Sequence, residues 1–215
     1  MKYLTDKVAW DTIKVIGFDL DGTLYDEYAF VEQAYEQVTK AWGLMGHVQY
    51  NVLQRMLDRW LEKGSSYPHI FEETLAHLNI NGEQKDRCIQ LALSVFRRFE
   101  PKLQLSSKTK HILRVFKERF RLFLFTDGGV NLQTSKVLSL GLNEFFSEDA
   151  IFISGQYGSE YVKPKTNIVP ELENVLQGVR SDRVLYIGDR VRDLKFAVNS
   201  GFEFCYISEL FKTHG

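Results

Sequence analysis

The hydrophobic pattern of this chain alternates between two forms. Short, nearly continuous apolar runs occur close to the start and again through the second half, whereas elsewhere apolar residues recur at spacings of three and four. Short runs are typical of buried strands, and the wider spacing is typical of amphipathic helices. Strands are therefore predicted at Ile13–Phe18, Arg121–Phe125, Ala150–Ile153, Arg183–Ile187 and Phe202–Ile207.

The stretch between the first two predicted strands has only the helical pattern. Helices are expected there at about 26–42, 48–63, 69–78 and 83–99, with glycine-containing breaks between them. A block of helices within a chain that otherwise has strands indicates an inserted domain. We predict an all-α domain at residues 26–100 and a second domain formed by residues 1–25 and 101–215.

The second half alternates between strands and helices. Helices are predicted at 129–140, 165–178 and 190–199, each between two predicted strands. This alternation favours an α/β fold in which helices cover both faces of a parallel sheet. Ligands of such sheets bind beyond the carboxyl ends of the strands, where the strand order reverses. The residues that follow each strand are therefore the candidates for chemistry.

Composition and charge narrow the class of protein. The 215 residues are 44% hydrophobic, which is enough for a substantial core. The 27 basic and 28 acidic residues give a net charge of -1, so no basic field favours nucleic acid or a membrane surface. The sequence has no uninterrupted apolar run of about 18 residues, so no membrane span is expected. Two distant cysteines and a start without an apolar signal core favour a reduced, cytoplasmic protein.

Two carboxylates directly follow the first predicted strand, in the segment Asp19-Leu20-Asp21-Gly22-Thr23. Asp19 and Asp21 share one side if the backbone stays extended, and Gly22 allows a sharp turn. Paired acids at a strand end can bind a hard cation such as Mg²⁺, and one of them can attack phosphorus to form an aspartyl phosphate. The alternative is an ordinary polar turn, in which Asp and Gly are common.

The next predicted strand, Arg121–Phe125, is followed by Thr126, Asp127 and Gly128. A threonine hydroxyl and the free backbone N–H groups at a helix start can bind phosphate oxygens. The competing interpretation is a simple helix cap. These three residues are therefore candidates for phosphate binding.

Two further strand ends carry charged residues. Lys163 lies before a predicted helix, where its ammonium can neutralise a nucleophilic carboxylate together with a phosphoryl group, although most lysines are simply solvated. Asp189 and Asp193 are four residues apart at a helix start and lie on one face, which suits a cation site. An N-cap and a dipole-complementing acid would give the same pattern.

Together these motifs resemble the haloacid dehalogenase superfamily, in its phosphatase branch. The resemblance covers about residues 13–207 and rests on the segment Asp19–Thr23, on Thr126, on Lys163-Pro164 and on Gly188-Asp189 with Asp193. It implies a Rossmann-like doubly wound core with a helical cap of the C1 type inserted after the first motif. The predicted helical block agrees with such a cap.

The resemblance also implies a role for each motif residue. Asp19 would be the nucleophile, and Asp21 would protonate the leaving group and then activate water. Mg²⁺ would be bound by the Asp19 carboxylate, the main-chain carbonyl of Asp21 and Asp189, with Asp193 assisting. The phosphoryl group would be bound by Thr126, Asp127, Gly128 and Lys163.

Two positions depart from the pattern of the superfamily. Many relatives have Asn where this chain has Asp127. Relatives often have about two residues between the glycine and the lysine of the third motif, whereas four separate Gly158 from Lys163 here. The longer loop could shift Lys163, in which case Lys165 is a weak substitute.

The function expected from these residues is Mg²⁺-dependent hydrolysis of a small phosphomonoester by a monomer or homodimer. A dehalogenase is disfavoured because that branch usually lacks the second aspartate, here Asp21. A signalling receiver domain is disfavoured because it has no cap. A phosphomutase similar to β-phosphoglucomutase stays open as an alternative, as does a non-catalytic protein that binds a phosphorylated ligand.

Overall fold

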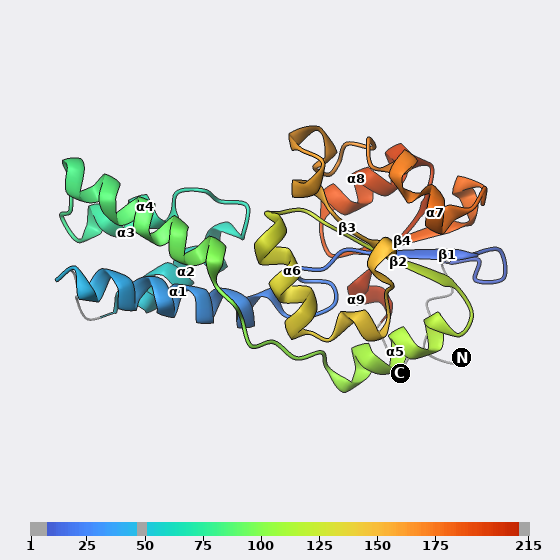
Figure 1. Cartoon of the computed structure of the whole chain (residues 1–215), viewed down its shortest axis with the longest axis horizontal. Coiled ribbons are helices and arrows are strands. Elements are labelled where there is room, and N and C mark those ends of the chain that lie inside the picture. Colours follow the sequence, from blue (N-terminus) through green and yellow to red (C-terminus); the bar gives the residue numbers. More distant parts are fainter. Residues whose placement is uncertain (1–7, 47–50, 211–215) are drawn as a thin grey trace. The chain divides into compact units, whose positions relative to one another are not determined.

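The computed structural model describes residues 8–46 and 51–210. The chain divides into two compact units (Figure 1). One unit ends at Asp26 and resumes at Gln104, and the other is Glu27–Leu103.

The first unit contains a parallel sheet of five strands. These are β1 (Val15–Phe18), β2 (Arg121–Thr126), β3 (Ile151–Ile153), β4 (Val184–Gly188) and β5 (Glu203–Tyr206). Their order is β3-β2-β1-β4-β5, and every neighbouring pair is parallel. The chain builds outward from β1 to β3, then crosses to β4 on the other side of β1. The carboxyl end of β1 is therefore the point of reversal where a ligand site is expected.

Helices cover both faces of this sheet, which confirms the predicted α/β fold class. Figure 1 shows α7 (Glu173–Leu176) and α8 (Val191–Ser200) on one face, with α5 (Ser107–Lys117) and α9 (Ile207–Leu210) on the other. The remaining helix of this unit, α6 (Val130–Ser139), follows β2. Neither α5 nor α9 was predicted from the hydrophobic pattern.

The helix predicted at 165–178 is wrong in its first part. The structure has a 3₁₀ turn at Val169–Leu172, followed by the short α7. Pro170 has no N–H to donate and disfavours helical geometry in the residue before it. Gln177 then ends α7 with a left-handed φ of 49°. A continuous helix cannot form across this segment.

Aromatic packing fixes the strand ends of the first unit. Its core includes Phe123, Phe125, Tyr186 and Phe196, all fully buried. Burial of each such side chain contributes about 1.5–3 kcal/mol. The Tyr186 hydroxyl also donates a hydrogen bond to the Phe125 carbonyl, 2.8 Å away. The ends of β2 and β4 are thus joined directly beneath the residues that follow them.

The second unit is all-helical, as the spacing of its apolar residues predicts. It contains α1 (Glu27–Leu44), α2 (Val52–Lys63), α3 (Ile70–His77) and α4 (Gly82–Arg98). The first residues predicted for the second helix, 48–50, lie outside the described residues. Trp42 is buried in this unit and its indole N–H donates to the Cys88 carbonyl, 2.9 Å away. In the described parts of the chain, no helix is both long and apolar enough to cross a membrane.

Candidate active site

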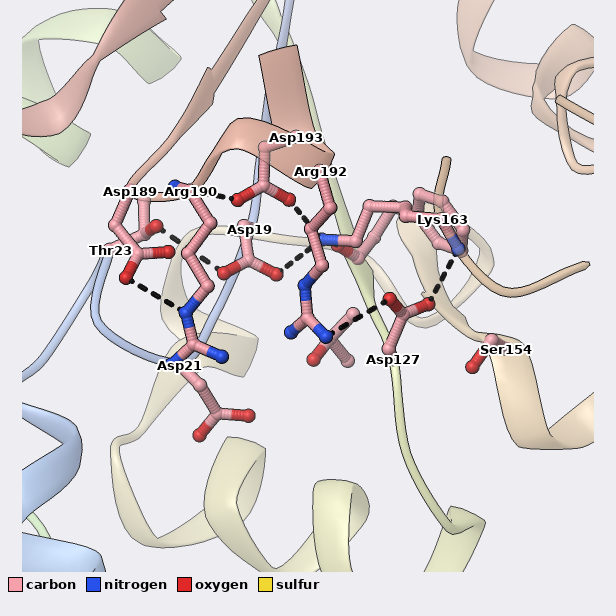
Figure 2. A network of polar contacts seen from close by, with 12 residues as sticks. Asp19, Asp21, Thr23, Asp127, Ser154, Lys163, Asp189, Arg190, Arg192 and Asp193 are labelled. Carbon is pink, nitrogen blue, oxygen red and sulfur yellow. Dashed lines mark hydrogen bonds and ion pairs between the residues drawn. The ribbon is translucent and has the colours of Figure 1, made fainter. Parts of the chain in front are cut away.

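The parallel register brings the polar residues of three strands to one edge of the sheet. Phe18, the last residue of β1, pairs with Leu124 of β2 and with Ile187 of β4. Asp19 follows β1 directly, Thr126 ends β2, and Asp189 follows β4. Figure 2 shows the resulting network of polar contacts.

Three carboxylates converge at this edge. Oxygen atoms of Asp19, Asp189 and Asp193 all lie within 4.8 Å of one another. Gly188 permits this approach, because a Cβ atom there would lie 2.5 Å from the Cβ atom of Asp193. Oδ1 of Asp189 is buried, and no described residue donates a hydrogen bond to it. An unsatisfied carboxylate oxygen in a group of three acids fits a hard cation such as Mg²⁺.

Lys163 lies within this cluster. Its Nζ is 2.5 Å from Oδ1 of Asp19, 2.6 Å from Oδ1 of Asp193 and 3.2 Å from the Tyr186 hydroxyl. The longer loop before Lys163 therefore does not move it away from the strand ends. Lys165, by contrast, pairs with Glu160 at the surface, 2.9 Å away.

The electrostatics of Asp19 follow from its burial among like charges. Burial raises the pKa of Asp19, the Lys163 ammonium lowers it, and the nearby Asp193 carboxylate raises it again, so that the pKa lies above its ordinary value. Burial lowers the pKa of Lys163, but the charges of Asp19 and its other partners outweigh this and raise the pKa well above its ordinary value. The Thr23 hydroxyl makes a long hydrogen bond, 3.4 Å, to Oδ2 of Asp19.

Asp21 lies apart from the three-carboxylate cluster (Figure 2). The extended backbone ends at Phe18, and Gly22 turns the chain with a φ of +77°. A side chain at Gly22 would also collide with Asp189, because its Cβ would lie 2.3 Å from Oδ2 of that residue. The Asp21 side chain is therefore not one of the three clustered carboxylates, although its charge still acts on Asp19 and raises the pKa of that residue. The metal ligand predicted at Asp21 is its main-chain carbonyl, which stays a prediction.

The side chain of Asp21 has its own set of donors. Oδ1 accepts from the Lys136 ammonium at 2.6 Å and from the Tyr25 hydroxyl at 2.5 Å, and Oδ2 accepts from the Gln133 amide at 2.9 Å. Burial raises the pKa of Asp21, but the Lys136 charge and these hydrogen bonds outweigh it and lower the pKa below its ordinary value. The pKa of Asp21 is thus lowered, whereas the pKa of Asp19 is raised.

The residues after β2 are already hydrogen-bonded. The Thr126 hydroxyl accepts from the Gln133 amide at 2.9 Å, and the Gly128 N–H donates to the Ser154 hydroxyl at 3.2 Å. Oδ1 of Asp127 accepts from the main-chain N–H of Lys163 at 3.2 Å. The Asp127 carboxylate can accept this hydrogen bond, just as the side-chain carbonyl of the Asn found in many relatives could. Phosphate binding by this segment stays a prediction.

Two arginines adjoin the cluster and were not identified from the sequence. The Arg190 side chain donates to Oδ2 of Asp189 at 3.2 Å, and the Arg192 guanidinium lies 3.9 Å from Oδ2 of Asp127. Both arise from the loop and first turn that carry Asp189 and Asp193, as Figure 2 shows. They add positive charge beside the carboxylates.

Sequence reasoning also missed the donors around Asp21, although α6 contained a signal. Gln133, Lys136, Val137 and Leu140 follow the spacing of a core-facing helical stripe. Two of these four positions hold long polar side chains, and both are buried. Polar residues in a core-facing stripe indicate an internal partner, which here is Asp21.

The parallel sheet, with acidic residues at its central strand ends and an inserted helical unit, defines a class of α/β hydrolases. The family model of haloacid dehalogenase-like hydrolases matches residues 13–201. The chain therefore belongs to the haloacid dehalogenase-like hydrolase family. The family and the hydrolase class predicted from the motifs are confirmed.

Curated relatives agree with the phosphatase branch. The chain is 28% identical over 194 residues to a glyceraldehyde 3-phosphate phosphatase of Methanopyrus kandleri, an alignment that covers 88% of this chain and 81% of the relative. It is 28% identical over 199 residues to the enzyme of the same name from Pyrococcus furiosus, with 89% and 79% covered.

Solved structures share the fold. YfnB of Bacillus subtilis, solved with bound magnesium, aligns with a TM-score of 0.66 at 17% identity, covering 90% of this chain and 86% of that one. A HAD-superfamily hydrolase of subfamily IA, variant 1, from Geobacter sulfurreducens aligns with a TM-score of 0.63 at 19% identity, again covering 90% and 86%. At these identities the likeness concerns the fold alone.

Proposed function

We propose that this protein is a phosphatase that hydrolyses a small phosphomonoester through an aspartyl phosphate on Asp19. The observation that carries the proposal is the separation of the two motif aspartates. Asp19 lies among acids with Lys163, whereas Asp21 is bound by a different set of donors. This difference supports a role in attack for Asp19 and a role in proton transfer for Asp21.

In the first step, an oxygen of Asp19 attacks phosphorus and the ester P–O bond breaks. Asp21, which takes up a proton when the phosphomonoester binds because its donors lower its pKa in the free protein, gives this proton to the leaving oxygen. The Lys163 ammonium offsets the negative charge of both Asp19 and the phosphoryl group, which otherwise repel each other. Thr126 donates its hydroxyl hydrogen to the phosphoryl group while its oxygen still accepts from the Gln133 amide.

In the second step, water attacks the aspartyl phosphate. Asp21, now a carboxylate, takes a proton from this water as its oxygen bonds to phosphorus. The bond between phosphorus and Asp19 breaks, inorganic phosphate leaves, and both aspartates return to their starting states. Splitting one displacement into two in this way lowers the barrier of each.

The proposed cofactor is Mg²⁺. The carboxylates of Asp19, Asp189 and Asp193 would bind it, together with the main-chain carbonyl of Asp21. When bound, it supplies positive charge that offsets the charge on the transferring phosphoryl group. The unpartnered oxygen of Asp189 supports this assignment.

The proposed substrate class is a small phosphorylated aldehyde or a related metabolite. The names of the curated relatives support this class. We further propose that the helical unit Glu27–Leu103 acts as the cap and selects among phosphate esters, as lids do when they exclude water from a site.

The test is phosphate release from a panel of small phosphomonoesters that includes glyceraldehyde 3-phosphate. The assay is run with Mg²⁺ and with a chelator, with Asp19→Asn as the blank. Release that depends on Mg²⁺ and is lost in the variant is expected. Transfer that requires a sugar bisphosphate would instead favour a phosphomutase, and no turnover of any ester would overturn the proposal.

A further inference from the structure

Lys136 forms a buried ion pair with Asp21. Lys136 and Asp21 are only 3% and 7% exposed, and Nζ lies 2.6 Å from Oδ1. Removing a lysine from water is costly unless a partner compensates for it. Lys136 lies on α6, ten positions after Thr126, and is linked to the proposed reaction through Asp21.

The donors occupy the two carboxylate oxygens of Asp21 unequally. Each oxygen of a carboxylate offers about two acceptor sites. Oδ1 receives the Lys136 ammonium and the Tyr25 hydroxyl, so both of its sites are filled. Oδ2 receives only the Gln133 amide among the described contacts and so retains one site.

Gln133 joins Asp21 to the end of β2. Its amide nitrogen lies 2.9 Å from Oδ2 of Asp21, 2.9 Å from the Thr126 hydroxyl and 2.6 Å from the Asp127 carbonyl. An amide has two hydrogens for these three acceptors. The acid/base carboxylate and the proposed phosphoryl ligand are therefore oriented by one side chain.

We propose that Lys136 is a positioning residue that anchors Oδ1 of Asp21, so that Oδ2 is the oxygen that gives and takes the proton. This inference rests on the proposed phosphatase function. Tyr25 completes the anchor at Oδ1, and Gln133 sets the direction of Oδ2. Without Lys136 the carboxylate loses one of its three donors and can rotate about its side-chain bonds.

The inference predicts a loss that depends on the leaving group. An alkyl phosphate needs a proton on its leaving oxygen, whereas p-nitrophenolate leaves without one. Misplacing the proton donor therefore slows phosphoenzyme formation from the alkyl ester far more than from p-nitrophenyl phosphate. A purely structural role for Lys136 would slow both to the same extent.

The experiment measures the first step in single turnover with wild type, Lys136→Met and Lys136→Arg. For Lys136→Met we expect the rate of phosphoenzyme formation from the alkyl ester to fall by about 100-fold or more. The rate of the p-nitrophenol burst from p-nitrophenyl phosphate should fall by less than about tenfold. Lys136→Arg keeps a cation and is expected to recover part of the alkyl-ester rate. Lys117→Met removes an exposed lysine of the same unit and serves as the matched control, with both rates unchanged.

Equal losses for the two esters would overturn the inference. If Lys136→Met does not fold, Tyr25→Phe decides the question, because it removes the second donor to Oδ1 and keeps the aromatic ring. A selective loss with the alkyl ester supports the inference, and equal fold-losses for the two esters contradict it. Failure of the proposed function is distinguishable, because wild type would then release phosphate from neither ester.

Discussion

Asp19 and Asp21 are two positions apart, yet their surroundings differ in charge. Asp19 shares the Lys163 ammonium with Asp193, and burial raises its pKa. Asp21 also loses solvation, but Lys136, Tyr25 and Gln133 donate to it and its pKa is lowered. Burial raises the pKa of both carboxylates, so the difference in direction comes from the donors that outweigh burial at Asp21 and from the negative charge of Asp193 beside Asp19.

This comparison explains how one motif can supply two chemical roles. The Asp19 site has an excess of negative charge that a bound cation would relieve. The Asp21 carboxylate has three protein donors and lies outside the carboxylate cluster. Substitutions at one of the two aspartate sites at a time test this difference.

The largest effect is expected for Asp19→Asn. The amide cannot form an aspartyl phosphate, so turnover should fall by a factor of about 10⁴ or more, by analogy with loss of other covalent nucleophiles. Phosphate release measures the loss, and circular dichroism checks that the fold is intact. A folded variant that keeps more than about a few per cent of wild-type activity would remove Asp19 from the role of nucleophile.

Lys163→Met tests whether Asp19 depends on its shared cation. The change leaves Asp19 and Asp193 buried without the ammonium between them, and such unpaired charges cost about 3–5 kcal/mol. The free energy of unfolding, measured by denaturant titration in chelator, should fall by this amount. An exposed ion pair contributes about 1 kcal/mol or less. A fall in the free energy of unfolding no larger than this would show that Lys163 is not the main stabilising partner of Asp19 and Asp193.

The raised pKa of Asp19 predicts that Mg²⁺ binding weakens at low pH. A proton on Asp19 competes with the cation, so affinity should be highest above the raised pKa and fall as the pH drops through it. If Asp19 had an ordinary carboxylate pKa of about 4, the affinity for Mg²⁺ would stay constant down to mildly acidic pH. Calorimetric titration at several pH values distinguishes the two, and a flat profile would contradict the environment described for Asp19.

The smallest effect is expected for Lys165→Met. Lys165 is half-exposed and pairs with Glu160 at the surface, so the change should alter the free energy of unfolding by about 0–1 kcal/mol. Activity should stay close to wild type. A large loss of phosphate release here, with Lys163 intact, would reverse the assignment of the two lysines.

Much of this arrangement could be predicted from the sequence, because strand ends are visible as the limits of apolar runs. Asp19, Thr126 and Asp189 follow such runs, and the parallel register brings them to one edge. The contacts of Lys163 could not be predicted, since they depend on the path of the loop after Gly158. Pro170 is the sequence signal for the interruption of the helix expected at 165–178, and apolar spacing alone does not show it.

The donors to Asp21 were harder to predict because each is an ordinary polar residue in its own segment. Lys136 looks like a solvated lysine until its place in the buried stripe of α6 is considered. Its partner is more than a hundred residues earlier in the chain. Local patterns describe elements well, but a pair of this separation becomes apparent only when the fold brings it together.

The most direct test of the account is to locate the phosphoryl group on the protein. Asp21→Asn is incubated with p-nitrophenyl phosphate and Mg²⁺, quenched in acid and analysed by peptide mass spectrometry. Because this leaving group needs no proton while hydrolysis needs the Asp21 base, the account predicts a phosphoryl group that accumulates on Asp19 and is absent from the variant that also carries Asp19→Asn. A phosphoryl group on any other residue would contradict it.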